Sequence, residues 1–145
     1  MRYTEIDLQC EDIMWFGIDS NGYIAAFTSG GSGNIPEFVC RSKEETDYLV
    51  RYFTGDMKTV SGVLLEHAND GSILVNDAIS FAHKGVFTYD VSYDEGHTEE
   101  YRQIAVPTQP IAVDHLPDDI RKVLSDHFIE CDLTKSRFVR VQHAY

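Results

Sequence analysis

Basic residues are scarce in this chain. Its 145 residues include 12 Lys and Arg against 24 Asp and Glu, which gives a formal net charge of −12 at pH 7. So negative a surface repels the phosphate backbone of DNA and RNA, and we therefore expect no direct binding of nucleic acid. A negative surface keeps a protein soluble, and it also suits a positively charged partner.

Cysteines and long hydrophobic runs are lacking as well. Cys10, Cys40 and Cys131 are odd in number and far apart, and none belongs to a C-x-x-C pair of the kind that binds zinc or carries redox chemistry. No apolar run is long enough to span a bilayer, and acidic residues stand near the N-terminus where a signal peptide has basic ones. We expect free thiols, no membrane partner and a cytoplasmic location.

Catalytic and metal-binding motifs are absent too. The histidines show no H-x-x-x-H or H-E-x-x-H spacing, and neither Ser29 nor Ser32 lies in a G-x-S-x-G elbow. Oxygen-bearing side chains alternate over 90–94 as at the start of a calcium loop, but Glu95 and Tyr101 occupy the sixth and twelfth positions, where that loop needs Gly and Glu. We predict no cofactor and no bound metal.

The chain does contain a clear β-hairpin pattern. Aromatic and β-branched residues favour strands over 15–18 and 23–27, and the pair Asn21-Gly22 supplies the positive φ angles of a tight turn. Alternation places Trp15 and Phe16 on opposite faces of the sheet. Each of these rings is compatible with a core position and with a contact to a partner.

A glycine-rich loop, Gly30-Gly31-Ser32-Gly33, follows the hairpin. Glycine lets backbone amides approach an anion closely. A Walker loop ends in Gly-Lys-Ser/Thr, however, and a dinucleotide loop needs another glycine where this chain has Pro36. We interpret the loop as the exit of the hairpin. The alternative hypothesis makes it the ligand loop of a small-molecule or metal-binding enzyme, with His or Asp residues nearby.

Periodicity predicts the remaining strands. Apolar residues at every second position indicate strands over 6–10, 87–93, 101–106 and 138–142. The polar loop 94–100 joins the second and third of these strands into a long antiparallel hairpin.

Capping signals predict the helices. Ser42 followed by Glu45 has the spacing of a capping box, and Pro117 is followed by two acids that favour a helix start. These signals predict helices over 42–53 and 116–128, and shorter helices are expected within 57–77 and over 78–82. Strands and helices without a regular βαβ rhythm predict a single α+β domain over 1–145, with a mainly antiparallel sheet and two to four helices.

Acidic residues gather around the tip of the predicted long hairpin. They are Asp90, Asp94, Glu95, Glu99 and Glu100. A protruding acidic loop can dock on a basic surface, and electrostatic attraction speeds association with cationic partners such as nuclease toxins. These five residues are our candidate partner-binding site, although a solvated turn also explains their spacing.

Five segments resemble, in the same order, parts of a group of small acidic uncharacterised bacterial proteins. The segments are 15–27 (WFGIDSNGYIAAF), 30–36 (GGSGNIP), 85–90 (GVFTYD), 101–107 (YRQIAVP) and 116–120 (LPDDI). The group resembles immunity proteins of bacterial toxin systems in size, acidity and lack of a catalytic signature. The resemblance implies a non-catalytic binding protein that neutralises a basic partner such as a toxin. It assigns no functional residue, and the sequence leaves the oligomeric state open.

Overall fold

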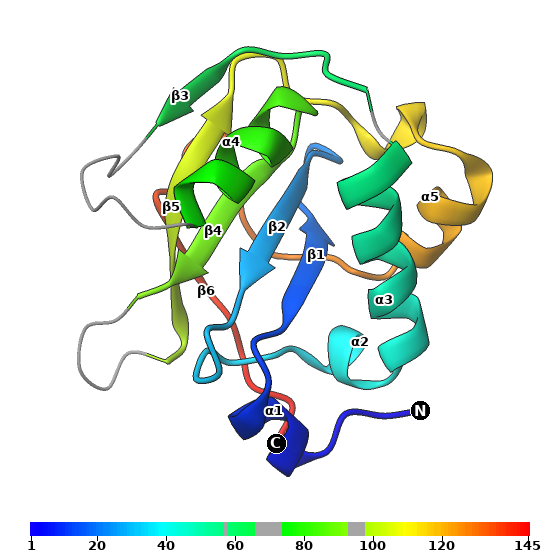
Figure 1. The fold of residues 1–145 in the computed structure, drawn as a ribbon, viewed down its shortest axis with the longest axis vertical. Helices are drawn as coiled ribbons and strands as arrows, with labels where there is room; N and C mark the ends of the chain where they lie inside the picture. Colours follow the sequence, from blue (N-terminus) through cyan, green and yellow to red (C-terminus); the bar gives the residue numbers. More distant parts are fainter. Residues whose placement is uncertain (57, 66–73, 93–97) are drawn as a thin grey trace.

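The structure is a computed structural model that describes residues 1–56, 58–65, 74–92 and 98–145. Helices and strands are interspersed along the chain (Figure 1). The elements are α1 (Glu5–Cys10), β1 (Met14–Ile18), β2 (Ile24–Thr28), α2 (Glu37–Cys40), α3 (Lys43–Arg51), β3 (Val63–Leu65), α4 (Leu74–His83), β4 (Phe87–Val91), β5 (Glu100–Pro107), α5 (Asp118–Leu124) and β6 (Phe138–Arg140). A π-helical turn, Tyr52–Asp56, extends α3. The predicted α+β class is confirmed.

The strands form one mixed sheet. Their order is β1-β2-β4-β5-β3, and β6 also pairs with β5. Among the described pairs of strands, β2–β4 alone is parallel, so the prediction of a mainly antiparallel sheet is confirmed. Parallel pairing needs a long connection, and α2, α3, β3 and α4 lie between β2 and β4 in the chain. The described residues form five α-helices, and the two short ones, α1 and α2, lie outside the predicted set.

The prediction of a strand over 6–10 is wrong, because these residues form α1. Thr4 caps the helix: its hydroxyl accepts a hydrogen bond from the Asp7 amide (3.2 Å), and the Asp7 carboxylate accepts one from the Thr4 amide (2.8 Å). This reciprocal pair satisfies two amides that a helix start leaves unbonded. Leu8 is buried, whereas Ile6 is 72% exposed, so the apolar alternation does not mark one buried face.

The helix expected within 57–77 is also a wrong prediction over 58–65. Residues 63–65 form strand β3, which pairs with β5 and places Leu64 opposite Val106. The open edge of β5 provides hydrogen-bond partners for this short segment, and that tertiary pairing outweighs an ambiguous local pattern. Residues 57 and 66–73 lie outside the described part of the chain. The next helix, α4, begins at Leu74 rather than at the predicted position 78.

Both predicted hairpins are confirmed. In β1–β2, Trp15 lies opposite Phe27, and Gly22 in the turn has the positive φ angle of 78° that the pattern requires. The β4–β5 pair is antiparallel as well, although positions 94–97 of its predicted loop 94–100 lie outside the described residues. The Ser42 hydroxyl caps α3 by accepting from the Glu45 amide (3.1 Å). The helix near Pro117 and the strand near 138–142 are present as α5 and β6.

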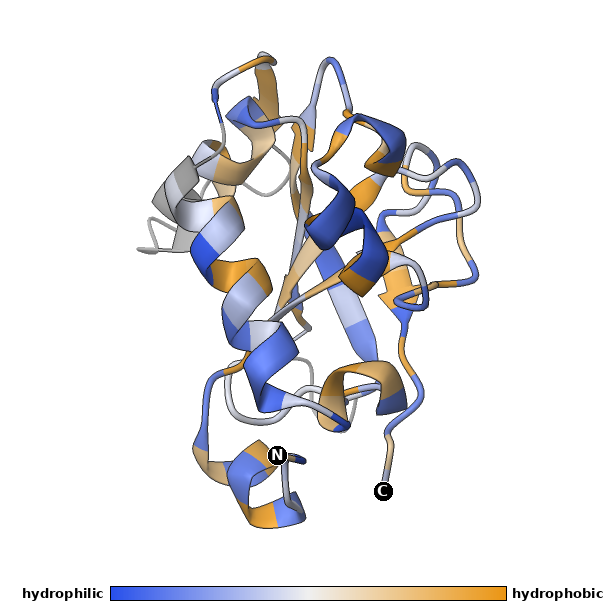
Figure 2. Ribbon diagram, turned by 90° about the vertical axis from the view of Figure 1, so that its right-hand side faces the viewer, coloured by the Kyte–Doolittle hydropathy of each residue, from blue (hydrophilic) through white to orange (hydrophobic). Residues whose placement is uncertain are grey.

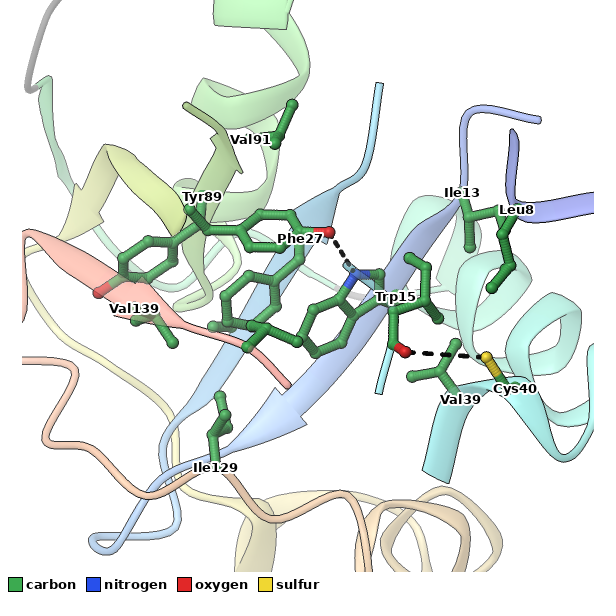
Figure 3. Close-up of a cluster of buried hydrophobic side chains, with 14 of the residues drawn as sticks. Leu8, Ile13, Trp15, Phe27, Val39, Cys40, Tyr89, Val91, Ile129 and Val139 are labelled. Atoms are coloured by element: carbon green, nitrogen blue, oxygen red, sulfur yellow. Dashed lines mark hydrogen bonds between the residues drawn. The ribbon is translucent and has the colours of Figure 1, made fainter. Parts of the chain in front are cut away.

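Trp15 is a core residue, which decides the question that the sequence left open. Its side chain is 1% exposed and stacks on Phe27 with 4.0 Å between ring centroids. Its indole nitrogen donates to the Tyr101 hydroxyl (3.4 Å), and that hydroxyl donates to the Asn34 carbonyl (2.7 Å). Figure 3 shows Leu8, from α1, among the residues around the indole. This side of the sheet, the Trp15 face, is closed by α1, α2 and the C-terminal segment.

Phe16 lies on the opposite side of the sheet, the Phe16 face, and is fully buried. It stacks on Phe53 of the π-helical turn, and the cluster around it includes residues of α3, α4 and α5. The two faces therefore have separate hydrophobic cores, and three longer helices cover the Phe16 face.

The two termini lie at the same end of the molecule (Figure 2). The Arg2 guanidinium binds the Glu37 carboxylate through two hydrogen bonds, of 2.5 and 2.7 Å. The Tyr145 hydroxyl donates to the Tyr3 carbonyl (2.5 Å). Within the described ranges, no helix is long and apolar enough to cross a membrane.

Candidate functional site

A groove runs between α3 and α4 on the Phe16 face. Figure 1 shows β1 and β2 in the space between these two helices, with no other helix in front of them. Three adjoining hollows share Met14 as a lining residue and together make up what we call the α3–α4 groove. One end lies beside the loop before β1, the middle lies under α4, and the other end lies beside Lys84.

Carboxylates line the end of the groove beside the loop before β1, which we call the acidic end. Glu11 and Asp12 come from that loop, and Asp47 comes from α3. All three are exposed, and none forms an ion pair with another described residue. Burial, followed by the carboxylates of Asp47 and Glu11, raises the pKa of the Tyr3 phenol to about 12. These two carboxylates thus disfavour ionisation of the phenol beside them.

Asp90 lies in the middle hollow, beneath α4. Its side chain is 7% exposed, and its Oδ1 accepts hydrogen bonds from the Thr28 hydroxyl (3.1 Å) and from the Val91 amide (2.9 Å). Burial raises the pKa of this carboxyl above its usual value. The charge of Asp12 adds to the increase, whereas Arg102 opposes it. Asp90 thus accepts hydrogen bonds from its own protein and lies opposite Arg102 of β5, but it forms no ion pair among the described residues.

The four carboxylates meet no cationic group among the residues that line their two hollows. The other lining residues there are neutral, and most of them are apolar. The single basic residue of the described groove is Lys84, at the far end, and its ammonium donates to the Phe53 carbonyl (2.7 Å). The groove therefore has an apolar floor, an acidic end and a basic end.

The glycine-rich loop holds Asp12 in place and does not form an open anion cradle. The Gly30 amide donates to the Asp12 carboxylate (2.8 Å), and the amides of 31–33 donate to the hydroxyl or the carbonyl of Ser29 at 2.8 to 3.4 Å. All four loop amides thus have acceptors within the protein, which leaves none for a phosphate group. No observation in the described residues favours the alternative of a ligand loop.

The structure separates the residues that the sequence singled out. Of the five predicted acids, Asp90 lines the groove, and Asp94 and Glu95 lie outside the described residues. Glu99 and Glu100 are half-buried at the start of β5, where their carbonyls accept hydrogen bonds from the amides of residues 141 and 92 (2.8 and 2.9 Å). Asp90 is buried rather than solvated, because α4 covers the strand that carries it.

Sequence reasoning missed the other three carboxylates of the groove. Glu11 and Asp12 precede the hairpin. Asp47 lies in the middle of α3, where the helical pattern indicates an ordinary solvent-exposed residue. No spacing rule connects these positions. The only local signal was the acidic pair at 11–12, directly before the first hairpin strand.

The histidines and thiols offer no reactive centre in this groove. His127 is 1% exposed and lies at the edge of β1, where its Nδ1 is 3.0 Å from the Phe16 carbonyl oxygen. A carbonyl only accepts, so Nδ1 carries the proton, and the buried Nε2 has no partner. Burial raises the pKa of the Cys40 and Cys131 thiols to about 11. The described part of the chain contains no group of three or more His, Cys, Asp or Glu residues that could hold a metal.

Comparison of the chain with protein-family models, with curated proteins and with solved structures finds no match in any of the three.

Proposed function

We propose that this protein is a non-catalytic cytoplasmic binding protein that neutralises a basic partner, such as a bacterial toxin, by holding it in the α3–α4 groove. One observation carries the proposal: four carboxylates line two adjoining hollows that have no Lys, Arg or His in their walls. A site of this charge attracts cations and repels phosphate and other anions.

The chemistry of the groove suits a protein surface better than a small anion or a nucleic acid. Its floor is built from Met14, Ala26 and Thr28, and Phe81 of α4 forms part of the wall. Apolar floors with charged rims are typical of protein interfaces, in which the apolar part supplies affinity and the charges supply attraction and orientation. The net charge of −12 adds long-range attraction for a basic partner.

Lys84 gives the groove a direction. It lies at the opposite end from Glu11 and Asp12. A bound segment gains the most when its basic end lies at the carboxylates and its acidic or neutral end lies beside Lys84. We therefore expect a partner segment with an uneven charge distribution.

A growth-rescue assay tests this function. The chain is co-expressed with basic toxins, beginning with products of the genes beside its own, and the wild type is expected to restore growth against one of them. The groove variant carries Glu11→Gln, Asp12→Asn and Asp47→Asn, and it is expected to lose rescue and to bind the purified toxin at least tenfold more weakly.

The control variant removes the same amount of charge elsewhere on the surface. It carries Asp114→Asn, Asp118→Asn and Glu130→Gln, all at exposed positions outside the groove. It is expected to keep rescue and to keep the Kd within about threefold, because distant surface charge acts weakly at physiological salt. Equal loss in both variants would show that net charge rather than the groove is responsible. Failure of the wild type against every basic toxin would overturn the function.

A further inference from the structure

Strand β6 is an open edge of the sheet. The amide of Val141 and the carbonyl of Arg137 form hydrogen bonds to β5 (2.8 and 2.7 Å), and Val139 pairs with β5 between them. The Val139 side chain lies in the core of the Trp15 face (Figure 3). Successive residues of a strand direct their backbone groups to opposite edges. The backbone groups of residues 138 and 140 therefore point away from β5, and they have no other partner in the described part of the chain.

A broad groove, the C-terminal groove, lies along this edge. Its volume is about 630 Å³, and residues 140–144 form one side of it. Residues 128–130 also line it. The amide of Ile129 donates to a carbonyl of β1 (2.8 Å), so the backbone groups of Phe128 and Glu130 point away from that strand, and neither has a backbone hydrogen bond within the described ranges. Two segments with unpaired backbone groups thus border one groove.

An extended polypeptide is the ligand that fits such an edge, because its backbone offers donors and acceptors at the spacing of a strand. The Phe128 ring is 50% exposed and offers an apolar contact beside the unpaired groups. The end of the segment is held in place, since the His143 ring accepts from the Ile35 amide (3.1 Å) and the Ala144 amide donates to the Ile35 carbonyl (2.9 Å). The edge is therefore ordered before a ligand arrives.

The C-terminal segment is the basic part of an acidic chain. Residues 133–145 contain three Lys or Arg and no Asp or Glu. Arg140 lines the groove, is exposed and forms no ion pair with another described residue. Of the two carboxylates in the lining, Glu37 is already bound by Arg2, and Glu130 lies on the segment across from β6. A ligand that places a carboxylate beside Arg140 gains attraction and a defined register.

The same charge disfavours pairing between two copies of this chain. β6 has three residues, so an antiparallel pair of two β6 strands would bring the two Arg140 side chains close together on one face. Like charges in neighbouring strands are destabilising, and charged residues on exposed edges prevent self-association in this way.

We propose that β6 binds an extended acidic segment of a partner protein, which adds to the sheet as a further strand in the C-terminal groove and places a carboxylate beside Arg140. Backbone hydrogen bonds would supply the affinity, and Arg140 and Phe128 would select the sequence. This surface is separate from the α3–α4 groove and opposite to it in charge preference, so the inference does not rest on the function proposed above.

NMR titration of the intact ¹⁵N-labelled chain with the peptide acetyl-TVEVEVT-amide tests the site. The expected result is a set of saturable shift changes confined to 128–130 and 138–142. Hydrogen exchange of the Arg140 amide is expected to slow about tenfold or more, because that amide gains a partner. The peptide acetyl-TVKVKVT-amide has a similar strand preference but the opposite charge, and it is expected to bind about fivefold more weakly or worse.

Methylated peptides test whether the backbone forms the contact. One peptide carries N-methyl groups on its three valines, and the other carries them on its two glutamates. Since successive amides point to opposite edges of a strand, each peptide has one edge blocked. One of the two is expected to lose binding, and the other is expected to keep its Kd within about threefold.

Variants of the protein separate the backbone from the charge. Gln142→Pro removes an amide on the outer edge and is expected to weaken binding about tenfold, whereas Gln142→Ala keeps that amide and the affinity. Arg140→Gln is expected to weaken binding of the acidic peptide about threefold or more. Lys122→Gln, on the exposed surface of α5, is the matched control and is expected to have no effect.

The outcomes separate this inference from the toxin-neutralising function. Equal binding of both methylated peptides, unchanged exchange at Arg140, or equal binding of the acidic and basic peptides would overturn the proposal. A dimer in sedimentation that Gln142→Pro dissociates would assign the edge to a second copy and would overturn the acidic partner. The triple variant of Glu11, Asp12 and Asp47 is expected to bind the peptide like the wild type, whatever the growth-rescue assay gives.

Discussion

Met14 and Trp15 are neighbours in β1 but lie on opposite faces of the sheet, and their surroundings differ. Trp15 is enclosed by aromatic rings and by residues of α1 and α2. Met14 is half-buried and lines all three hollows of the α3–α4 groove. The strand is equally apolar at both positions. What differs is coverage: short helices and the C-terminal segment close the Trp15 face, whereas α3 and α4 leave an open groove between them on the Phe16 face.

Two buried titratable groups show the same contrast. His127 is fixed through Nδ1 at the edge of β1, and its Nε2 is buried without a partner. Asp90 is almost as buried, but it borders the hollow beneath α4. Burial moves the pKa of each group toward its neutral form, so the pKa of His127 is lowered and that of Asp90 is raised. We assign a structural role to His127, whereas Asp90 belongs to the binding groove proposed above.

The largest effect is expected from Trp15→Ala. Removing this ring leaves a cavity among Phe27 and Tyr101, and the free energy of unfolding is expected to fall by about 3–5 kcal/mol. Chemical denaturation followed by far-UV circular dichroism measures the change, since the variant loses the only tryptophan. Phe128→Ala is the control, because that ring is 50% exposed and its removal is expected to cost under about 1 kcal/mol. Similar losses in the two variants would contradict a closed Trp15 face.

Gly33→Ala tests how tightly the glycine-rich loop lies against the same core. A Cβ at this position would lie 2.5 Å from the Tyr101 hydroxyl oxygen and 3.1 Å from a methyl carbon of Val91. We expect a loss of about 1–3 kcal/mol in the free energy of unfolding, since Tyr101 is fully buried and must shift to accept the added methyl group. Gly55→Ala is the matched control, because no atom lies within 4 Å of its added Cβ. A neutral Gly33→Ala would show that the loop is loosely held.

His127 is expected to make the protein sensitive to acid. Its pKa in the folded state is lowered from 6.5, first by burial, while the Phe16 carbonyl and Asp126 oppose the change. The folded state therefore binds this proton less readily than the unfolded state. Stability is unaffected by this group above pH 6.5 and falls as the pH drops below that value.

Denaturation curves between pH 5 and 8 check this expectation. His127→Gln is expected to be less stable at neutral pH but to lose part of the acid dependence, whereas the exposed His115→Gln is expected to retain it in full. An unchanged acid dependence in His127→Gln would mean that other groups dominate in this range.

The smallest effect on stability is expected from Asp90→Asn. The pKa of Asp90 is raised by burial, so its favourable contribution is present below the unfolded pKa of 3.8 and is lost as the pH rises through the folded value. An amide does not ionise, so Asp90→Asn does not lose stability as the pH rises. We expect stability at pH 8 to rise or to stay within about 1 kcal/mol of the wild type. A large loss of stability in thermal unfolding would assign Asp90 a structural role and remove its contrast with His127.

Local signals in the sequence determined several elements of this protein. The Asn21-Gly22 turn, the Ser42 cap and the alternation over 87–91 each act within a few residues, so the pattern alone predicts the hairpin, α3 and β4. The helix α1 was readable in the same way from Thr4 and Asp7, but the apolar alternation over 6–10 pointed to a strand.

Only the tertiary structure decided the rest. The parallel pairing of β2 with β4 and the strand β3 depend on partners far along the chain. The groove depends even more on long-range contacts. Asp12, Asp47 and Asp90 come from a loop, a helix and a strand that lie far apart in the sequence. The free energy of long-range packing brings these carboxylates to one surface, and no spacing between residues encodes that packing.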